Sequence, residues 1–521
     1  MEEKGTFREE MGSNGVFSNK RRLKRLLCSW ACLWRIFLIL SLLFYTQLLF
    51  SSDLLQWRHC DTTTGTAEET TAIIASSAKL TTDSTYSGDL CELQTAWNTL
   101  TFGSNPSPKH LKIALFVKKW PSRRKAAGLE RHAQTLHRIL AQRGHKVHVF
   151  TRLLQEPIEV LRDDKAMQFH FNNYSGPGKA SSWSLFQKIS KKVNGFDIIH
   201  SESVSLPDKY AKGLPNVVAT WHGIAYEIIH SDIVQDLARD PVEPRSHTLE
   251  RALKGRVGKV VEEIKFFPNY RHHIAISDYA GDVLRKIYML PVENIHIILN
   301  GVDPKMFRPN PVRGQAFRAL HNVPQNAQLV VGMAGRLVRD KGHPMVFRVL
   351  REMFMGNQNK NMFFLIAGDG PWASRYTELG SNIKVVGSLS SDQLGDFYNA
   401  LDIFMNPTLR AQGLDLTLLE AMFCGKPLLA THFSSIIRSV VPSEEFGYTF
   451  SPTHESLKKG LERVLEDGKK VVKKKGRACR KRATLLFTAE KMASAYERLF
   501  LCIAKGHKNG TDLCKYPLNF D

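Results

Sequence analysis

Residues 406–431 read NPTLRAQGLDLTLLEAMFCGKPLLAT, and this stretch decides the fold class. It predicts a strand end, a Gly-containing turn, a short helix and a second strand in direct succession. The helix is expected to begin just after Gly413 and to bury one side, so that its free N–H groups point into the turn and attract an anion. Residues 424–427 end the helix with Gly and Pro, and residues 428–431 predict a buried parallel strand. This order of elements indicates a ligand-binding crevice.

Glu420 is the unusual residue of that helix. Its carboxylate would lie about one turn from an anion-attracting terminus, where it could accept hydrogen bonds from the hydroxyls of a diol. A solvated helix glutamate explains the local pattern equally well. The local sequence leaves both interpretations of Glu420 open.

Strands and helices alternate on both sides of this stretch. Residues 112–117, 129–143 and 147–150 predict a strand, a helix and a strand, which is the opening of a Rossmann-type domain. A second series begins at residue 329, after a junction near residues 302–311, and includes a helix at 345–355. Two doubly wound α/β domains are therefore expected, with a ligand cleft between the carboxyl ends of their strands. The further predicted strands are 197–200, 217–220, 273–276, 295–299, 329–332, 362–367, 384–387 and 402–405.

The first 108 residues differ from this pattern. Residues 1–25 are polar and end in the basic cluster 20–25, whereas residues 26–50 are apolar apart from Arg35 and a few small polar residues. As a helix, the apolar span would be about 37 Å long, enough to cross a ~30 Å hydrocarbon core. We predict a cytosolic tail (1–25), a transmembrane anchor (26–50) and a Ser- and Thr-rich stem (51–108). A cleaved signal peptide is the alternative to the anchor.

The remaining chain is then expected to lie in a lumen. Sequons at Asn173 and Asn509 are compatible with a glycoprotein there. The eight cysteines include no CxxC pair, so zinc sites are not indicated, and Cys60 with Cys91 is a candidate disulfide.

The charge is strongly basic, with 72 Lys and Arg against 50 Asp and Glu and a net charge of +22. Such a protein favours a membrane surface, nucleic acid or an acidic polymer. Residues 469–482, KKVVKKKGRACRKR, contain no acidic residue. A solvated helix face is the common explanation of such a run, and docking of an anionic acceptor or of the membrane is the alternative.

Several loops that follow predicted strands carry candidate ligand-binding residues. Arg336 and Lys341, after Gly335, lie on a strand-to-helix loop where two cations can grip two linked phosphates. His222 follows the strand 217–220, at the edge that faces the cleft, although a structural histidine is equally compatible. Gly128 allows backbone N–H groups to approach a ligand. No GxxxxGK[ST] and no D-x-D occurs, which argues against a nucleoside triphosphatase and against a metal held by paired aspartates.

Taken in order, these motifs resemble the family 4 retaining glycosyltransferases of the GT-B fold, from residue 111 to about 490. The resemblance implies a nucleotide-sugar donor, taken as a UDP-sugar, and a glycan or polysaccharide acceptor that can be anionic. It implies no metal or other cofactor, and no nucleic acid partner is expected. The motifs that carry it are 128–130, His222, 275–277, 299–303 with Phe307, Gly335-Arg336 with Lys341-Gly342, 367–371 and 413–420.

The resemblance also implies residue roles. Arg336 and Lys341 would bind the diphosphate, Glu420 the ribose hydroxyls, and Gly128 and His222 would close over the phosphate and sugar. The expected catalytic residues are His222, Arg336, Lys341 and Glu420. The expected donor site contains Gly128, Gly335, Arg336, Lys341, Gln412, Gly413, Leu414, Asp415 and Glu420.

The chain departs from the family pattern around the donor sugar. Gln412 stands where a glutamate is usual, residues 413–415 are Gly-Leu-Asp where Gly-Phe-Gly is usual, and Ala127 stands where a second glycine is common. Gln412 removes a negative charge that would repel a carboxylate-bearing sugar, whereas Asp415 could restore that charge and keep a neutral hexose as donor. A non-catalytic nucleotide-sugar or polysaccharide binder is the alternative function.

The expected organisation is a single-pass type II protein of the Golgi or ER membrane with a luminal catalytic part. Its globular parts are predicted to be an N-terminal Rossmann-like acceptor domain (109–305), a C-terminal Rossmann-like donor domain (306–487), and a C-terminal helix and tail (488–521).

Overall fold

The computed structural model describes residues 97, 107, 109–121, 128–152, 166–172, 178–237, 239, 247–355, 362–411 and 414–505. The predicted tail and anchor, most of the predicted stem, both sequons, and Cys60 and Cys91 lie outside these residues. Among the helices that are described, none is both long enough and apolar enough to cross a membrane. Trp97, within the predicted stem, is buried and donates a 3.0 Å hydrogen bond to the Leu486 carbonyl oxygen, so packed structure begins before residue 109.

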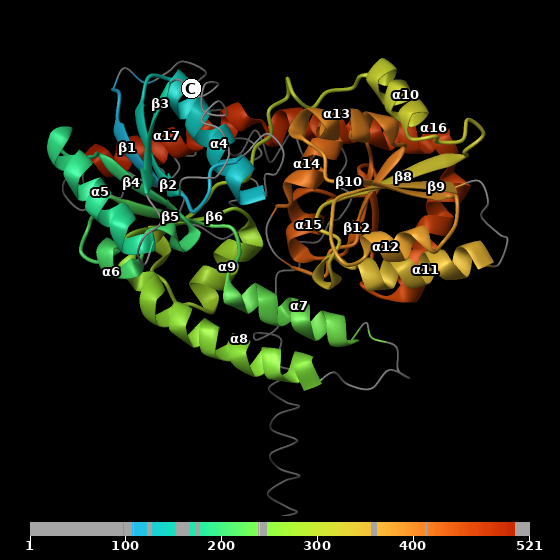
Figure 1. Ribbon diagram of the computed structural model, residues 1–521, viewed down its shortest axis with the longest axis horizontal. Helices are drawn as coiled ribbons and strands as arrows, with labels where there is room; N and C mark the ends of the chain where they lie inside the picture. Colours follow the sequence, from blue (N-terminus) through green and yellow to red (C-terminus); the bar gives the residue numbers. More distant parts are fainter. Residues whose placement is uncertain are drawn as a thin grey trace, which may run out of the picture. The chain divides into compact units, whose positions relative to one another are not determined.

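The first domain is built on a seven-stranded parallel sheet with the order β3-β2-β1-β4-β5-β6-β7 (Figure 1). Its strands are β1 (Lys112–Phe116), β2 (Lys146–Arg152), β3 (Met167–Asn172), β4 (Ile198–Glu202), β5 (Val217–Trp221), β6 (His272–Ala275) and β7 (Ile295–Ile297). Its helices are α4 (Gly128–Gln142), α5 (Gly178–Lys192), α6 (Asp208–Ala211), α7 (Ala225–Leu237), α8 (His247–Phe266) and α9 (Asp278–Lys286).

The second domain repeats this architecture with a six-stranded parallel sheet of the order β10-β9-β8-β11-β12-β13. Its strands are β8 (Leu329–Ala334), β9 (Met362–Ala367), β10 (Ile383–Gly387), β11 (Ile403–Asn406), β12 (Leu428–Thr431) and β13 (Gly447–Phe450). Its helices are α10 (Pro311–Leu320), α11 (His343–Met355), α12 (Ala373–Thr377), α13 (Ser391–Ala400), α14 (Leu416–Phe423), α15 (Ser434–Ser439) and α16 (His454–Leu486). Both orders contain the 3-2-1-4-5-6 pattern of dinucleotide-binding folds, so each sheet has a switch point between its first and fourth strands.

The sequence explains the strands and helix starts of both sheets. The internal strand β9, MFFLIA, is buried at every position, because helices cover both faces of a parallel sheet. Side-chain caps fix the starts of α9, where the Ser277 side chain accepts from Ala280 N, and of α13, where Ser390 and Gln393 form a capping box.

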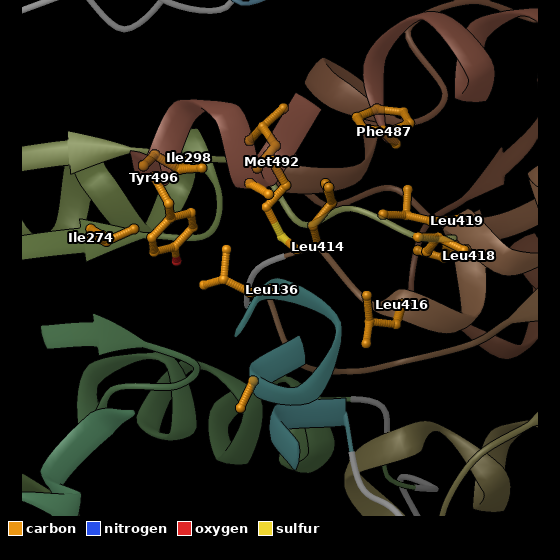
Figure 2. Packing of buried hydrophobic residues seen from close by; sticks show 14 of the residues in the cluster. Leu136, Ile274, Ile298, Leu414, Leu416, Leu418, Leu419, Phe487, Met492 and Tyr496 are labelled. Atoms are coloured by element: carbon orange, nitrogen blue, oxygen red, sulfur yellow. The ribbon is translucent and has the colours of Figure 1, made fainter. Parts of the chain in front are cut away.

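The C-terminal helix α17 (Ala489–Lys505) joins the two domains. It follows α16, which is kinked at Gly468, and it packs on α4 of the first domain. The Glu497 carboxylate accepts hydrogen bonds from Arg143 (2.6 Å) and His145 (2.8 Å). Figure 2 shows the buried cluster around this helix, which runs from Ile274 and Ile298 of the first domain through Tyr496 and Met492 of α17 to Leu414, Leu416, Leu418 and Leu419.

The structure confirms the two-domain α/β fold and the order of the predicted strands. Two edge strands, β3 and β13, were not predicted, and neither was the pair α7 and α8. The expectation that the helix of residues 416–423 buries one side is wrong, because Leu416 to Phe423 of α14 are buried at every position except Thr417. Glu420 is among the buried residues, which excludes the solvated interpretation.

Buried neutral histidines predict an acid-sensitive fold. Burial lowers the pKa of His132, His273 and His296 to about 3. The unfolded chain therefore binds protons that the folded chain excludes, and the free energy of unfolding should fall as the pH drops from about 6.5 toward 4, by up to ~1.4 kcal/mol per pH unit for each such histidine. Thermal unfolding of the full chain at pH 7.5, 6.5 and 5.5 measures this loss.

His296→Gln should flatten that pH dependence, whereas His432→Gln, at an exposed histidine, should leave it unchanged. An unfolding midpoint that stays constant from pH 7.5 to 5.5, or equal slopes in the two variants, would contradict the explanation.

Candidate functional site

The candidate site lies at the two switch points, where loops leave the carboxyl ends of the strands. In the first domain, α4 follows β1, Glu202 ends β4, and His222 follows β5. In the second domain, residues 335–342 follow β8 and residues 407–415 follow β11. The topology therefore brings the predicted residues of each domain to one edge of its sheet.

Gly342 shapes the loop that carries Arg336 and Lys341. It has φ 79°, and a Cβ at this position would lie 2.0 Å from the Pro407 carbonyl oxygen, so only glycine allows the loops after β8 and β11 to approach this closely. The turn directs Lys341 toward the second loop, where its Nζ lies 2.6 Å from the Asp415 carboxylate. Burial would raise the pKa of Asp415, but the Lys341 ammonium outweighs that effect and holds it below its usual value.

Two arginines flank this pair. The Arg336 side chain is 66% exposed and lies 4.0 Å from Asp340, so it is accessible to a ligand. Arg410, which the sequence analysis missed, lies 3.5 Å from the same carboxylate and is largely buried. Its Nε has no hydrogen-bond partner within the described part of the chain. Arg336, Lys341 and Arg410 thus gather around the carboxylates of Asp340 and Asp415.

Glu420 links the two domains. One carboxylate oxygen binds the guanidinium of Arg131, from the first turn of α4, and the other accepts a 2.8 Å hydrogen bond from the Tyr398 hydroxyl of α13. Burial raises the pKa of Glu420, and Arg131 and Tyr398 oppose that rise. Burial disfavours the charge of Arg131 as well, but Glu420 outweighs this effect and the pKa of Arg131 is raised. Both carboxylate oxygens of Glu420, the residue predicted to bind the ribose, therefore already contact protein groups.

His222 is held by a buried carboxylate. Its Nε2 lies 2.6 Å from Glu202, which is fully buried and whose second oxygen has no partner among the described residues. Burial lowers the pKa of His222 to about 4 and raises the pKa of Glu202. The arrangement is a neutral imidazole that donates its Nε2 proton to Glu202 and keeps a lone pair on Nδ1.

His132 packs edge-on against His222, with ring centroids 4.7 Å apart, and a series of hydrogen bonds connects it to His137. The series begins at His137 Nδ1, which lies 2.8 Å from the Ala133 carbonyl oxygen and donates to it. Burial lowers the pKa of His132, His137 and His200. The later bonds are His200 Nδ1 to His137 Nε2 (3.0 Å), Thr220 to His200 Nε2 (2.8 Å), Tyr496 to Thr220 (3.0 Å) and His132 Nε2 to Tyr496 (3.4 Å).

His132 Nδ1 and Oδ1 of the neighbouring Asn300 have no other hydrogen-bond partner in the described structure, and the Asn300 side chain raises the pKa of His132. A ligand hydroxyl carries one proton and would therefore donate to only one of these two atoms.

A divalent cation is a second candidate ligand for the group formed by His132, Glu202 and His222. His132, Glu202 and His222 each offer one ligand atom within 4.8 Å of the others. Both histidines already use Nε2 in the hydrogen bonds described above, so only the Nδ1 lone pairs are open to a metal unless those bonds break. The hydrogen-bonded arrangement favours a polar ligand over a metal here.

The structure places the other predicted residues as follows. Gly128 is exposed and begins α4, and Gly335, with φ 134°, follows β8. Leu414 is buried, and its carbonyl oxygen accepts a 2.7 Å hydrogen bond from Asn300. Gln412 and Gly413 lie outside the described residues.

The first turn of α4 brings the two halves of the site together. Arg131 binds Glu420 of the second domain, and the adjacent His132 contacts His222 of the first. The sequence analysis missed Arg131, His132, Glu202 and Arg410. Applying the switch-point rule to the end of β4 could have identified Glu202, whereas nothing local identified the other three.

Comparison with known families agrees with the two-domain division. Residues 126–306 match Glycosyltransferase Family 4, and residues 319–484 match Glycosyl transferases group 1.

Curated relatives match over parts of their length. A 2-deoxystreptamine glucosyltransferase of Streptomyces kanamyceticus is 26% identical over 26% of this chain and 36% of its own. A D-inositol 3-phosphate glycosyltransferase of Corynebacterium diphtheriae is 22% identical over 61% of this chain and 77% of its own. The chain spans between 36% and 49% of the length of three of the curated relatives.

Solved structures share the fold. Sucrose-phosphate synthase from Thermosynechococcus elongatus superposes with a TM-score of 0.57 at 20% identity, covering 74% of this chain and 96% of that one. The Anabaena protein HepE, crystallised with UDP-glucose, superposes with a TM-score of 0.54 at 18% identity, covering 74% and 97%. With its two matching families and this architecture, the chain carries the two domains of a GT-B glycosyltransferase, family 4 in its first half and group 1 in its second.

Proposed function

We propose that this protein is a retaining glycosyltransferase that moves a sugar from a UDP-sugar to a glycan or polysaccharide acceptor without a metal. The observation that carries the proposal is the first turn of α4, which joins His222 of one domain to Glu420 of the other through His132 and Arg131. A donor bound between the domains would contact both sheets at their switch points. The Anabaena protein with the same fold binds UDP-glucose in its crystal structure.

The cations of the second domain would hold the diphosphate. Arg336 is exposed and able to make directional, charge-assisted hydrogen bonds to phosphate oxygens. Lys341 would break its ion pair with Asp415 and bind the phosphate instead. Together with Arg410 and the N-terminus of α14, they would offset the charge of the leaving group, which is the role a metal plays elsewhere. Glu420 would accept hydrogen bonds from the ribose hydroxyls after Arg131 or Tyr398 has moved away from its carboxylate.

The first domain would hold the sugar. His222 and the polar atoms of His132 and Asn300 suit the hydroxyls of a glycosyl unit. In the proposed mechanism the acceptor hydroxyl approaches on the face of the leaving group, and the departing phosphate takes its proton. This step needs no pair of carboxylates of the glycosidase kind.

We further propose a type II topology in the Golgi or ER membrane, with residues 26–50 as the anchor. Cys502 is disulfide-bonded, which suits an oxidising lumen. The basic cluster at residues 20–25 favours a cytosolic N-terminus.

The donor prediction concerns Gln412. A glutamate there would repel a uronic-acid donor by about 4 kcal/mol at ~4 Å and an effective dielectric of ~20, which is an upper figure. Asp415 pairs with Lys341 in the structure, and it would restore a negative charge near the sugar if Lys341 leaves it for the phosphate. We expect turnover of UDP-uronic acids by the full chain in the presence of a chelator, with retained anomeric configuration by NMR, and a selective loss of that turnover in Gln412→Glu.

Gln412→Met, which is uncharged, is the control for side-chain shape, and UDP-hexoses are the control donors. A wild type that uses only neutral donors, with no change of preference in Gln412→Glu, refutes the uronic-acid hypothesis. Binding without transfer or hydrolysis across all donors and acceptors would instead favour the non-catalytic binder.

The diphosphate prediction compares three variants of one loop. Arg336→Ala should weaken UDP binding by about 1.5–3 kcal/mol, or about ten- to hundredfold, and should slow turnover, since hydrogen bonds to charged groups are worth this much. Lys341→Ala should lose less, because in the wild type Lys341 must give up its ion pair with Asp415 to bind the phosphate. Arg339→Ala, at an exposed arginine of the same turn, is the control and should bind UDP normally by calorimetry. Wild-type affinity in both Arg336→Ala and Lys341→Ala would place the diphosphate elsewhere.

The topology prediction uses protease protection in sealed vesicles. A C-terminal tag should resist digestion until detergent is added, whereas an N-terminal tag should be digested at once. Digestion of the C-terminal tag without detergent is incompatible with the proposed orientation.

A further inference from the structure

A cavity lies in the second domain, away from the candidate site. Its volume is about 940 Å³, and it is lined by the start of α10, the turn from α13 to β11, the turn from α14 to β12, and one face of α16. Those turns precede β11 and β12, so the cavity is at the amino ends of the strands, whereas the candidate site is at their carboxyl ends. We call it the basic pocket.

The lining is strongly cationic. It includes one carboxylate, Asp402, which is already occupied by Arg318 at 3.1 Å and by the backbone N–H of Val330 at 2.8 Å. The cations of the basic pocket are Arg318, Lys426, Lys473, Arg477, Arg480 and Lys481.

Three of these cations form a line on α16. Lys473, Arg477 and Lys481 are four residues apart, so they lie on one helix face, and all three are exposed. Within the described residues none of them forms an ion pair or a side-chain hydrogen bond. Like charges at this spacing destabilise a helix by a few tenths of a kcal/mol per pair, a cost that a bound anion would remove.

Lys426 brings a further charge to the pocket from the turn after α14. Its half-buried ammonium donates to the carbonyl oxygens of Asn399 (3.2 Å) and Leu401 (2.8 Å), neither of which neutralises it. Helix α16 packs closely against this turn, because a Cβ at Gly476 would lie 2.1 Å from the Gly425 carbonyl oxygen. The glycine contact therefore holds the line of cations beside Lys426.

We propose that the basic pocket binds an acidic glycan segment, one that carries carboxylate or sulfate groups, and so holds an anionic acceptor on the second domain. The line from Lys473 to Lys481 covers about 12 Å of helix, which suits a chain of charged units better than one small anion. Apolar lining residues such as Leu485, which is 64% exposed, offer a surface for the C–H faces of sugars. The hollow shape suits a chain segment better than a flat bilayer. The inference rests on the proposed function only in taking the anion to be a glycan.

The test measures binding of hexagalacturonate to the full chain in neutral detergent, without donor, at 50 and 300 mM salt. We expect binding that salt weakens, and a loss of at least about tenfold in the variant Lys473→Ser, Arg477→Ser, Lys481→Ser. The matched control Lys459→Ser, Lys470→Ser, Lys474→Ser removes three exposed charges of the same helix outside the pocket and should bind normally. UDP affinity should be unchanged in both variants, which separates this inference from the proposed donor site.

Three outcomes would overturn the proposal. They are equal losses in the two variants, equal binding of a neutral hexasaccharide, and binding of the chain to anionic vesicles with none to hexagalacturonate. The last outcome would identify the pocket as a membrane contact.

Discussion

The ion pair between Arg131 and Glu420 is the contact on which the candidate site depends. It joins the first turn of α4 to α14, and Glu420 is almost fully buried. Removing one partner of a buried pair leaves an uncompensated charge, which costs about 3–5 kcal/mol, so neither Arg131 nor Glu420 can be replaced alone without destabilising this contact. It also occupies the carboxylate that the family resemblance assigns to ribose, so in the proposed function the donor and Arg131 would compete for one side chain.

The fold could be predicted because a parallel sheet buries both faces of its strands. Runs such as MFFLIA in β9 and LLAT in β12 are therefore apolar at almost every position, and glycines and caps mark the helices between them. The edge strands β3, MQFHFN, and β13, GYTF, were missed because polar residues and short length weaken the same signal. Helix α7 was missed for a related reason, since it buries polar residues, Glu227 and Asp232, along with its apolar ones.

The site could be predicted only where one loop carries the whole pattern. Gly335, Arg336, Lys341 and Gly342 are close in the sequence, and so is the stretch that contains Glu420. Their partners are not: Arg131 is 289 residues from Glu420, and the hydrogen-bond chain to His132 passes through Tyr496 of the C-terminal helix. Such partners follow from how α4 and α17 pack, which no local pattern specifies.

The two cationic regions of the second domain differ in how their charges are balanced. In the candidate site, Lys341 pairs with Asp415 and Arg410 faces Asp340, so in the proposed function an incoming diphosphate would exchange places with carboxylates of the protein. In the basic pocket, Lys473, Arg477 and Lys481 pair with no carboxylate of the described part of the chain. When a cation must leave a protein carboxylate to bind a phosphate, the net electrostatic gain is small, and the geometry of the hydrogen bonds decides which anion binds. Exposed cations without such a partner attract any anion of high charge density, and salt screens that attraction. Selectivity for the donor therefore suits the cleft, and capture of a long acidic chain suits the pocket.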